Sequence, residues 1–133
     1  MEVFFREGTF NGKANALDVY NAFQELVQRD GRLLPEAIVI ASEDFNSPLH
    51  ELIEWEDDKA AQEYRLNQAR RLIRSVRIRR DPDAPVEPAY VNIRVMTDQG
   101  QERFYQETSV VILDDAMFTS AVEILMQKLM AAQ

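Results

Sequence analysis

The residues of this chain best suited to bind another molecule are arginines that lie close together in the sequence. Seven arginines and no acidic residue fall between Arg65 and Arg80. The whole chain has a formal charge of −8, and these seven residues contribute +7, so the rest of the chain carries −15. Arginine binds phosphates and carboxylates through two parallel hydrogen bonds, which lysine does less well. This segment is therefore the strongest binding signal in the sequence.

Three interpretations of the arginine segment remain open. Its side chains can bind nucleic acid, they can bind an acidic protein, or they can form a solvated surface that the acidic remainder neutralises. The acidic balance of the chain argues against bulk binding of nucleic acid, although one local basic patch can still bind it. The residues predicted to contact a partner or nucleic acid are Arg70, Arg74, Arg77, Arg79 and Arg80.

Residues that support catalysis or metal binding are scarce. The chain has one histidine, His50, and no cysteine, which excludes disulfides and thiolate metal sites. The acidic residues near His50 match no standard ligand pattern, and Ser47 has no nucleophile-elbow context. The sequence also lacks a glycine-rich phosphate loop. We therefore predict no catalytic residue, no cofactor-binding residue, no metal ligand and no enzymatic activity.

Helical periodicity and capping residues predict a helical N-terminal part. Asn15 begins the first helix and Gly31 closes it, because glycine readily adopts the left-handed conformation at a helix end. Pro35 and Pro48 each stand at a helix start, where the missing N–H has no cost. The longest helix meets no glycine or proline before Pro82. The predicted helices span residues 15–29, 35–42, 48–55 and 57–79.

Arg65 is predicted on the apolar side of the longest helix, where a charged side chain is unusual. A charge in that position must be paired or must extend to water. Because buried charges are normally paired, we expect a salt bridge from Arg65 to Glu54, Glu56 or Asp57.

The C-terminal part is predicted to contain a β-hairpin. Three prolines within residues 81–88 favour an extended connector. Residues 89–97 alternate between apolar and polar types, residues 102–112 are rich in β-forming types, and Asp98-Gln99-Gly100 between them is a turn signal. Residues 1–5 are predicted to add an edge strand, which would give a three-stranded sheet with this hairpin.

The last predicted helix begins at Asp114 or Asp115 and continues to about Ala131. It is apolar almost all round, which is typical of a helix that is central in a protein or shared between chains. Methionine-rich surfaces adapt readily to partners, and twofold dimers are the commonest soluble assembly. We therefore predict a homodimer. The residues predicted to form its contact are Met117, Phe118, Leu125, Met126, Leu129 and Met130.

Together these elements predict an α+β fold in a single domain that spans residues 1–133. The helical part covers about residues 13–80, the proline-rich connector residues 81–88, and the hairpin with the last helix residues 89–133. The sequence contains no apolar run that approaches membrane-spanning length, and its N-terminus lacks a signal-peptide pattern. We therefore expect a soluble cytoplasmic protein with no membrane partner.

Short motifs follow one another through the middle of the chain. They are Gly31-Arg32-Leu33, Pro35-Glu36-Ala37, Ala41, the SPLH run of residues 47–50, Trp55-Glu56-Asp57, Ala60-Ala61, Tyr64-Arg65, Gln68-Ala69-Arg70 and Leu72-Ile73. This arrangement resembles a family of small phage- and prophage-encoded proteins, over roughly residues 31–75 and more loosely after Ala89. Glu56 departs from the pattern, since the family more often has Asp there. The resemblance implies a phage context and a helical middle, and it assigns no activity.

Two functions from different classes follow from these observations. We predict a non-enzymatic phage accessory protein that acts through protein–protein contacts in the host cytoplasm, as a homo-oligomer, on a phage or host protein. The alternative is a nucleic-acid-associated phage protein that uses a basic helix over residues 65–80. Salt distinguishes the two, because phosphate contacts weaken steeply with salt whereas apolar protein contacts do not.

Overall fold

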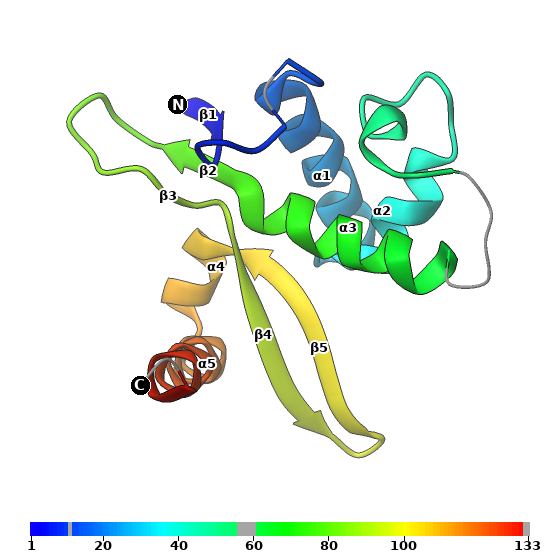
Figure 1. Cartoon of the computed structure of the whole chain (residues 1–133). Coiled ribbons are helices and arrows are strands. Elements are labelled where there is room, and N and C mark those ends of the chain that lie inside the picture. Colours follow the sequence, from blue (N-terminus) through cyan, green and yellow to red (C-terminus); the bar gives the residue numbers. More distant parts are fainter. Residues whose placement is uncertain (11, 56–60, 132–133) are drawn as a thin grey trace. The chain divides into compact units, whose positions relative to one another are not determined.

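The computed structural model describes residues 1–10, 12–55 and 61–131, which form an α+β fold. The predicted fold class is confirmed, with helices in the N-terminal part and a hairpin followed by a helix in the C-terminal part (Figure 1). The chain forms two compact units, Met1–Ala89 and Tyr90–Gln133. The boundary between them directly follows the proline-rich residues 81–88. That residues 1–133 form a single domain stays a prediction.

Helix α1 spans Ala16–Asp30, as its sequence predicts. The side chain of Asn15 accepts hydrogen bonds from the backbone N–H groups of Leu17 and Asp18 and so caps the N-terminus. Gly31 follows the helix with a φ of 78°, a left-handed conformation that glycine adopts without a Cβ clash. Local residues alone therefore define both ends of α1.

The prediction of a helix over residues 48–55 is wrong. In this region the structure has only a 3₁₀ turn, η1, over His50–Leu52. In an α-helix the N–H of Glu54 would donate to the carbonyl of His50. Instead this N–H donates to Oε1 of Gln68, and the His50 carbonyl accepts a hydrogen bond from Nε1 of Trp55. A long-range hydrogen bond to Gln68 and a local one from the Trp55 side chain thus replace the helical one, and the chain leaves the turn in an extended conformation.

Helix α3 spans Ala61–Ser75, and strand β2 follows it directly over Val76–Arg79. The prediction of one helix that continues to Arg79 is therefore wrong at its C-terminal end. Val76 and Ile78 are β-branched, buried and alternate with arginines, which is the period of two that a strand requires. The predicted start of this helix at Asp57 lies outside the described residues.

Strand β2 is the central strand of a three-stranded antiparallel sheet with the order β1-β2-β3. Strand β1 spans Glu2–Phe5, and the two-residue strand β3 spans Glu87–Pro88 in the predicted connector. The prediction that residues 1–5 join the C-terminal hairpin is wrong, because β1 pairs with β2. In this register Phe4 lies opposite Arg77, so both side chains point from the same face of the sheet.

The helices of the first unit bury their apolar sides against one another and against the sheet. Helix α2 spans Pro35–Ser42, as predicted, and contacts α1, α3 and η1, while α1 also contacts β1. The largest fully buried side chains of this unit are Val19, Phe23, Leu33, Ile38, Leu49, Leu72, Ile73 and Val76. These residues come from α1, α2, α3, β2 and the segments between them, so one core holds the unit together.

The second unit begins with the predicted hairpin, which is confirmed. Strands β4, Tyr90–Thr97, and β5, Gly100–Glu107, pair antiparallel along their whole length. Thr97 pairs with Gly100, so Asp98 and Gln99 form a two-residue turn. Gly100 has a φ of 109°, which favours glycine at this position.

Two helices follow the hairpin. The predicted β-rich segment ends earlier than expected, because residues after Glu107 form helix α4, Thr108–Leu113. Helix α5 spans Asp115–Ala131, and the carboxylate of Asp114 accepts a hydrogen bond from the Met117 N–H, so the predicted cap is confirmed. Helix α4 contacts both strands and α5, and these contacts favour a helix over the β propensity of its sequence.

Candidate interaction surfaces

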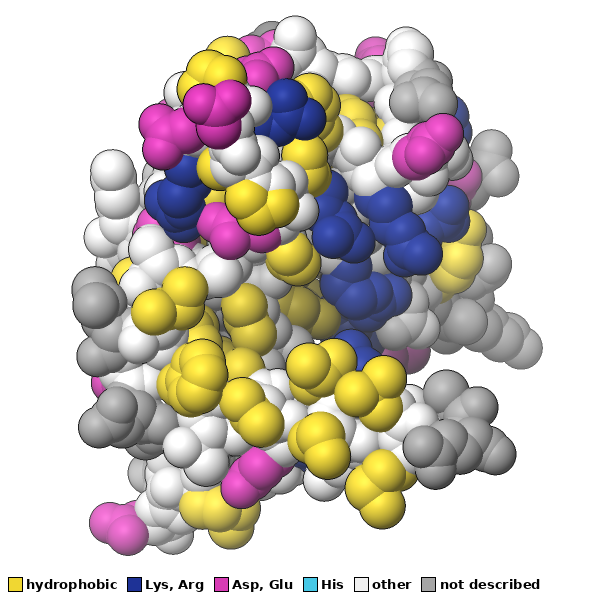
Figure 2. Space-filling view, turned by 90° about the vertical axis from the view of Figure 1, so that its left-hand side faces the viewer, with side chains coloured by type: hydrophobic (Ala, Val, Ile, Leu, Met, Phe, Trp, Pro, Cys, Tyr) yellow, Lys and Arg dark blue, Asp and Glu magenta, His cyan; other side chains and the backbone are white. Residues whose placement is uncertain are grey.

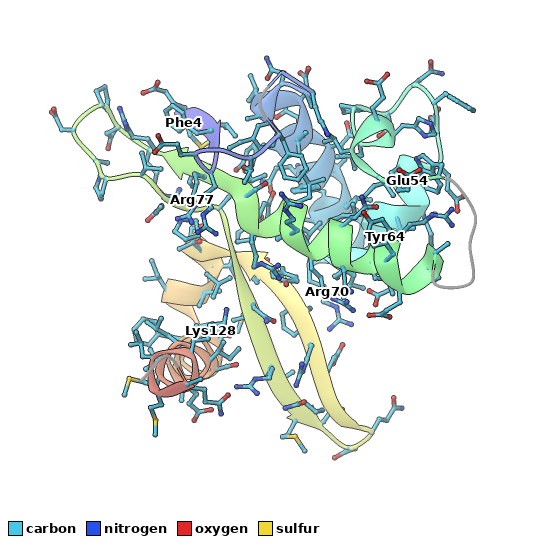
Figure 3. All side chains as sticks on the ribbon, in the orientation of Figure 1. Phe4, Glu54, Tyr64, Arg70, Arg77 and Lys128 are labelled. Carbon is cyan, nitrogen blue, oxygen red and sulfur yellow. The ribbon has the colours of Figure 1, made fainter. Side chains whose placement is uncertain are left out.

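The predicted contact arginines do not lie on one basic helix. Arg70 and Arg74 are four residues apart on α3 and so lie on the same side of it. Arg77 and Arg79 lie on one face of β2, and Arg80 follows that strand. Figure 3 labels Arg70 and Arg77 on these two elements. The predicted basic helix over residues 65–80 is therefore wrong, and its arginines are divided between a helix and a sheet.

Three of the five predicted contact arginines form ion pairs within the first unit. The pairs are Arg70–Glu63 at 3.2 Å, Arg79–Glu2 at 3.7 Å and Arg80–Glu87 at 2.9 Å. Such partly exposed pairs contribute only about 0–1 kcal/mol to stability. Each pair nevertheless places a carboxylate beside a guanidinium that an anionic partner would have to contact. Acidic neighbours therefore neutralise more than half of the predicted contact set.

Three arginines of the segment have no ion pair with an acid among the described residues. Within the described part of the chain no ion pair joins Arg71, Arg74 or Arg77 to a carboxylate. The guanidinium of Arg71 lies 5.6 Å from the ring centroid of Phe10, and Nε of Arg77 is buried without a hydrogen bond. We call these three residues the unmatched arginines. They are the ones that remain able to bind an added anion.

Arg65 donates hydrogen bonds to two backbone carbonyls, and its expected salt bridge stays a prediction. Its Nε donates to the backbone carbonyl of Glu54 at 2.9 Å, and its Nη2 donates to the backbone carbonyl of Trp55 at 3.3 Å. The guanidinium also lies 4.8 Å from the centroid of the Trp55 ring system, within the range of a cation–π contact. The other expected partners, Glu56 and Asp57, lie outside the described residues. Arg65 therefore fixes the backbone at Glu54 and Trp55.

His50 takes part in the same cluster. Its ring stacks on Trp55 at 5.4 Å and 9°, and the Phe45 ring lies 4.4 Å away on a tilted plane. Nδ1 of His50 lies 2.7 Å from the carbonyl oxygen of Ser42, and because a carbonyl only accepts, Nδ1 carries a proton. Among the described residues no group of three or more His, Asp or Glu side chains could hold a metal ion. The contacts of His50 thus serve packing.

One side of α5 exposes a stripe of large apolar side chains, visible as a row in the lower part of Figure 2. We call this stripe the α5 apolar face. Its members are Phe118, Val122, Leu125, Met126, Leu129 and Met130. Five of these six are predicted oligomer contacts, and Leu125 is 56% exposed. Met117, which was also predicted, is only half-exposed, and Val122 was missed because its exposure depends on how α5 is turned.

The opposite side of α5 is partly polar and faces strand β4. The hydroxyl of Ser120 accepts a hydrogen bond from the Arg94 N–H at 2.9 Å and donates one to the Arg94 carbonyl at 2.7 Å. The Arg94 side chain also donates to Oε1 of Gln127. Ile124 is the buried apolar residue between these two contacts. Hydrogen bonds to one strand residue therefore fix α5 in a rotation that leaves most of its apolar residues exposed.

No helix within residues 1–10, 12–55 and 61–131 is long and apolar enough to cross a membrane. A contiguous apolar patch on a protein surface marks a contact site more often than it marks an accident of packing. Among the described residues, the α5 apolar face is therefore the strongest candidate for an interaction surface.

Comparisons of the chain with protein-family models, with curated proteins and with solved structures find no match. The resemblance to phage-encoded proteins therefore rests on the sequence motifs alone and stays a prediction. The function has to be argued from the surfaces described above.

Proposed function

We propose that this protein is a non-enzymatic accessory protein of a phage that acts through protein–protein contacts as a homo-oligomer. The α5 apolar face carries this proposal. The phage context and the host cytoplasm as the site of action rest on the sequence motifs. The partner class is a phage or host protein.

The energetic argument for a contact is that solvent-exposed apolar surface costs free energy that an interface would recover. Burial of apolar surface contributes roughly 25 cal/mol per Å². An isolated exposed leucine or methionine needs no explanation, but six large apolar side chains on consecutive turns of one helix form a patch. Four turns of α5 thus offer one continuous apolar surface to a partner.

The test of this proposal is the oligomeric state of a variant that carries Leu125→Glu and Leu129→Glu. Two charges at the centre of the α5 apolar face would have to be desolvated in any interface, so we expect association to weaken by more than 100-fold. Sedimentation velocity over a concentration series measures this. The control replaces two exposed apolar residues elsewhere, Ile40→Glu and Met96→Glu. A wild-type protein that remains monomeric at high micromolar concentration would contradict the proposal.

A second candidate function, contact with nucleic acid, is favoured only by the unmatched arginines. Arg74 and Arg77 lie near the junction of α3 and β2 without an acidic neighbour among the described residues. Three charges are few for phosphate binding, since proteins with strong affinity neutralise about 6–10 phosphates. The acidic character of the remaining chain further opposes it.

The two functions are distinguished by titration of a labelled single-stranded and a labelled double-stranded DNA oligonucleotide at two salt concentrations. Under the proposed function, fluorescence anisotropy shows no binding below about 100 µM at physiological salt, because non-specific contacts of basic proteins have dissociation constants of about 1–100 µM. The variant Arg74→Glu with Arg77→Glu should behave like the wild type. Tight, salt-sensitive binding that this variant abolishes would instead support a nucleic-acid protein.

A further inference from the structure

We propose that the α5 apolar face binds the same face of a second copy of this chain, with the two α5 helices antiparallel about a twofold axis. This inference rests on the proposed function and specifies its partner. A twofold contact requires a surface that is complementary to itself. Four residues of the α5 apolar face meet this requirement, because Phe118 and Val122 lie as far before the midpoint between residues 123 and 124 as Leu129 and Leu125 lie after it.

Four residues of the α5 apolar face have the spacing that is found where two helices pack along their length, and we call these four residues the seam. Phe118, Val122, Leu125 and Leu129 follow one another at intervals of four, three and four residues. These intervals repeat every seven residues, the pattern in which one helix inserts its side chains between those of another. Residues of this pattern form a seam about two heptads long. In the antiparallel register Phe118 lies beside Leu129 of the second copy, and Val122 lies beside Leu125 of that copy.

The available area fits a dimer of this kind. Large apolar side chains have roughly 200 Å² of surface each, and the six residues of the α5 apolar face expose about half of it, so each copy offers on the order of 600 Å². A standard stable interface buries about 800 Å² per partner. The face therefore supplies most of a dimer interface without any contribution from other elements.

Charge favours the antiparallel orientation over the parallel one. Lys128 lies in the last turn of α5, and Asp114 lies at its N-terminal end. A parallel pair would place Lys128 beside Lys128 and Asp114 beside Asp114. An antiparallel pair brings Lys128 to within about 8 Å, along the helix axis, of Asp114 of the second copy, and it also opposes the two helix dipoles.

Cysteine cross-linking tests the orientation directly, because the chain has no cysteine of its own. The variants Phe118→Cys and Leu129→Cys are each made alone and also co-expressed with tags of different size. An antiparallel seam brings Phe118→Cys beside Leu129→Cys, within the roughly 7 Å between Cα atoms that a disulfide tolerates. It separates two copies of the same cysteine by about 16 Å along the axis. We therefore expect a disulfide between the two tagged chains and none within either variant alone.

The outcomes separate this inference from the proposed function. Rapid disulfide formation in each single variant would overturn it in favour of a parallel pair. A dimer by sedimentation velocity that forms no disulfide in the co-expressed sample would also overturn it, because the dimer would then use another surface. Sedimentation of the single variants as dimers under reducing conditions confirms that the cysteines have not disrupted the fold. A monomeric wild-type chain would contradict the proposed function itself.

Discussion

Replacement of Phe23 by alanine is expected to lower the free energy of unfolding of the first unit by about 3–5 kcal/mol. Phe23 lies on the buried side of α1 and has no exposed surface. Its removal leaves a cavity that the surrounding helices fill only in part, so transfer and packing energy are both lost. Because small domains have total stabilities of about 5–15 kcal/mol, this single change removes a large fraction of the stability.

Urea denaturation monitored by tryptophan fluorescence measures this loss. Trp55 is the only tryptophan of the chain and lies in the first unit, so its signal reports on that unit. The matched control is Phe45→Ala, since Phe45 is 85% exposed and loses mainly its contact with the His50 ring. The control should cost less than about 1 kcal/mol. Equal effects of the two changes would contradict the core described here.

Replacement of Ser120 by alanine is expected to release α5 from the hairpin. The Ser120 hydroxyl satisfies both backbone groups of Arg94 at the free edge of β4, and it is buried. Its removal leaves an N–H and a carbonyl without their partner, which costs about 1–3 kcal/mol. The effect is large for this unit, because a two-stranded hairpin is only marginally stable unless a helix packs against it.

Hydrogen exchange at the Arg94 amide measures the effect of Ser120→Ala. A loss of about 1–3 kcal/mol corresponds to exchange that is about 5- to 150-fold faster. Thr119→Ala is the control, because Thr119 is the exposed neighbour on the same turn of α5. Unchanged exchange at Arg94 in the Ser120 variant would show that this hydroxyl does not fix the helix.

The position of Ser120 also explains why α5 exposes the apolar face on which the proposed function rests. The helix is turned so that Ser120, Ile124 and Gln127 face β4, and the larger apolar residues face away. A more usual amphipathic helix would bury those residues against the sheet. If Ser120→Ala frees the helix to rotate, the same variant should also weaken self-association, which sedimentation velocity would reveal.

The sequence by itself determined those features that depend on neighbouring residues in the chain. Asn15 and Gly31 defined α1 because a side-chain cap and a left-handed glycine act within one helical turn. The Asp98-Gln99 turn defined the hairpin for the same reason, since it joins strands that are adjacent in sequence. The apolar composition of residues 117–130 predicted an interaction helix, and five of its predicted contacts are exposed.

The tertiary structure alone decided where the arginine segment stops being a helix. The alternation in Val76-Arg77-Ile78-Arg79 is a strand signal, but four residues also fit the last turn of a helix. Pairing with β1, which lies more than 70 positions earlier in the chain, selects the strand. The same long-range contacts place Glu2 beside Arg79 and Glu87 beside Arg80. Charge balance on a surface depends on which distant acids fold against it, so sequence spacing could not reveal that Arg79 and Arg80 are already paired with acids.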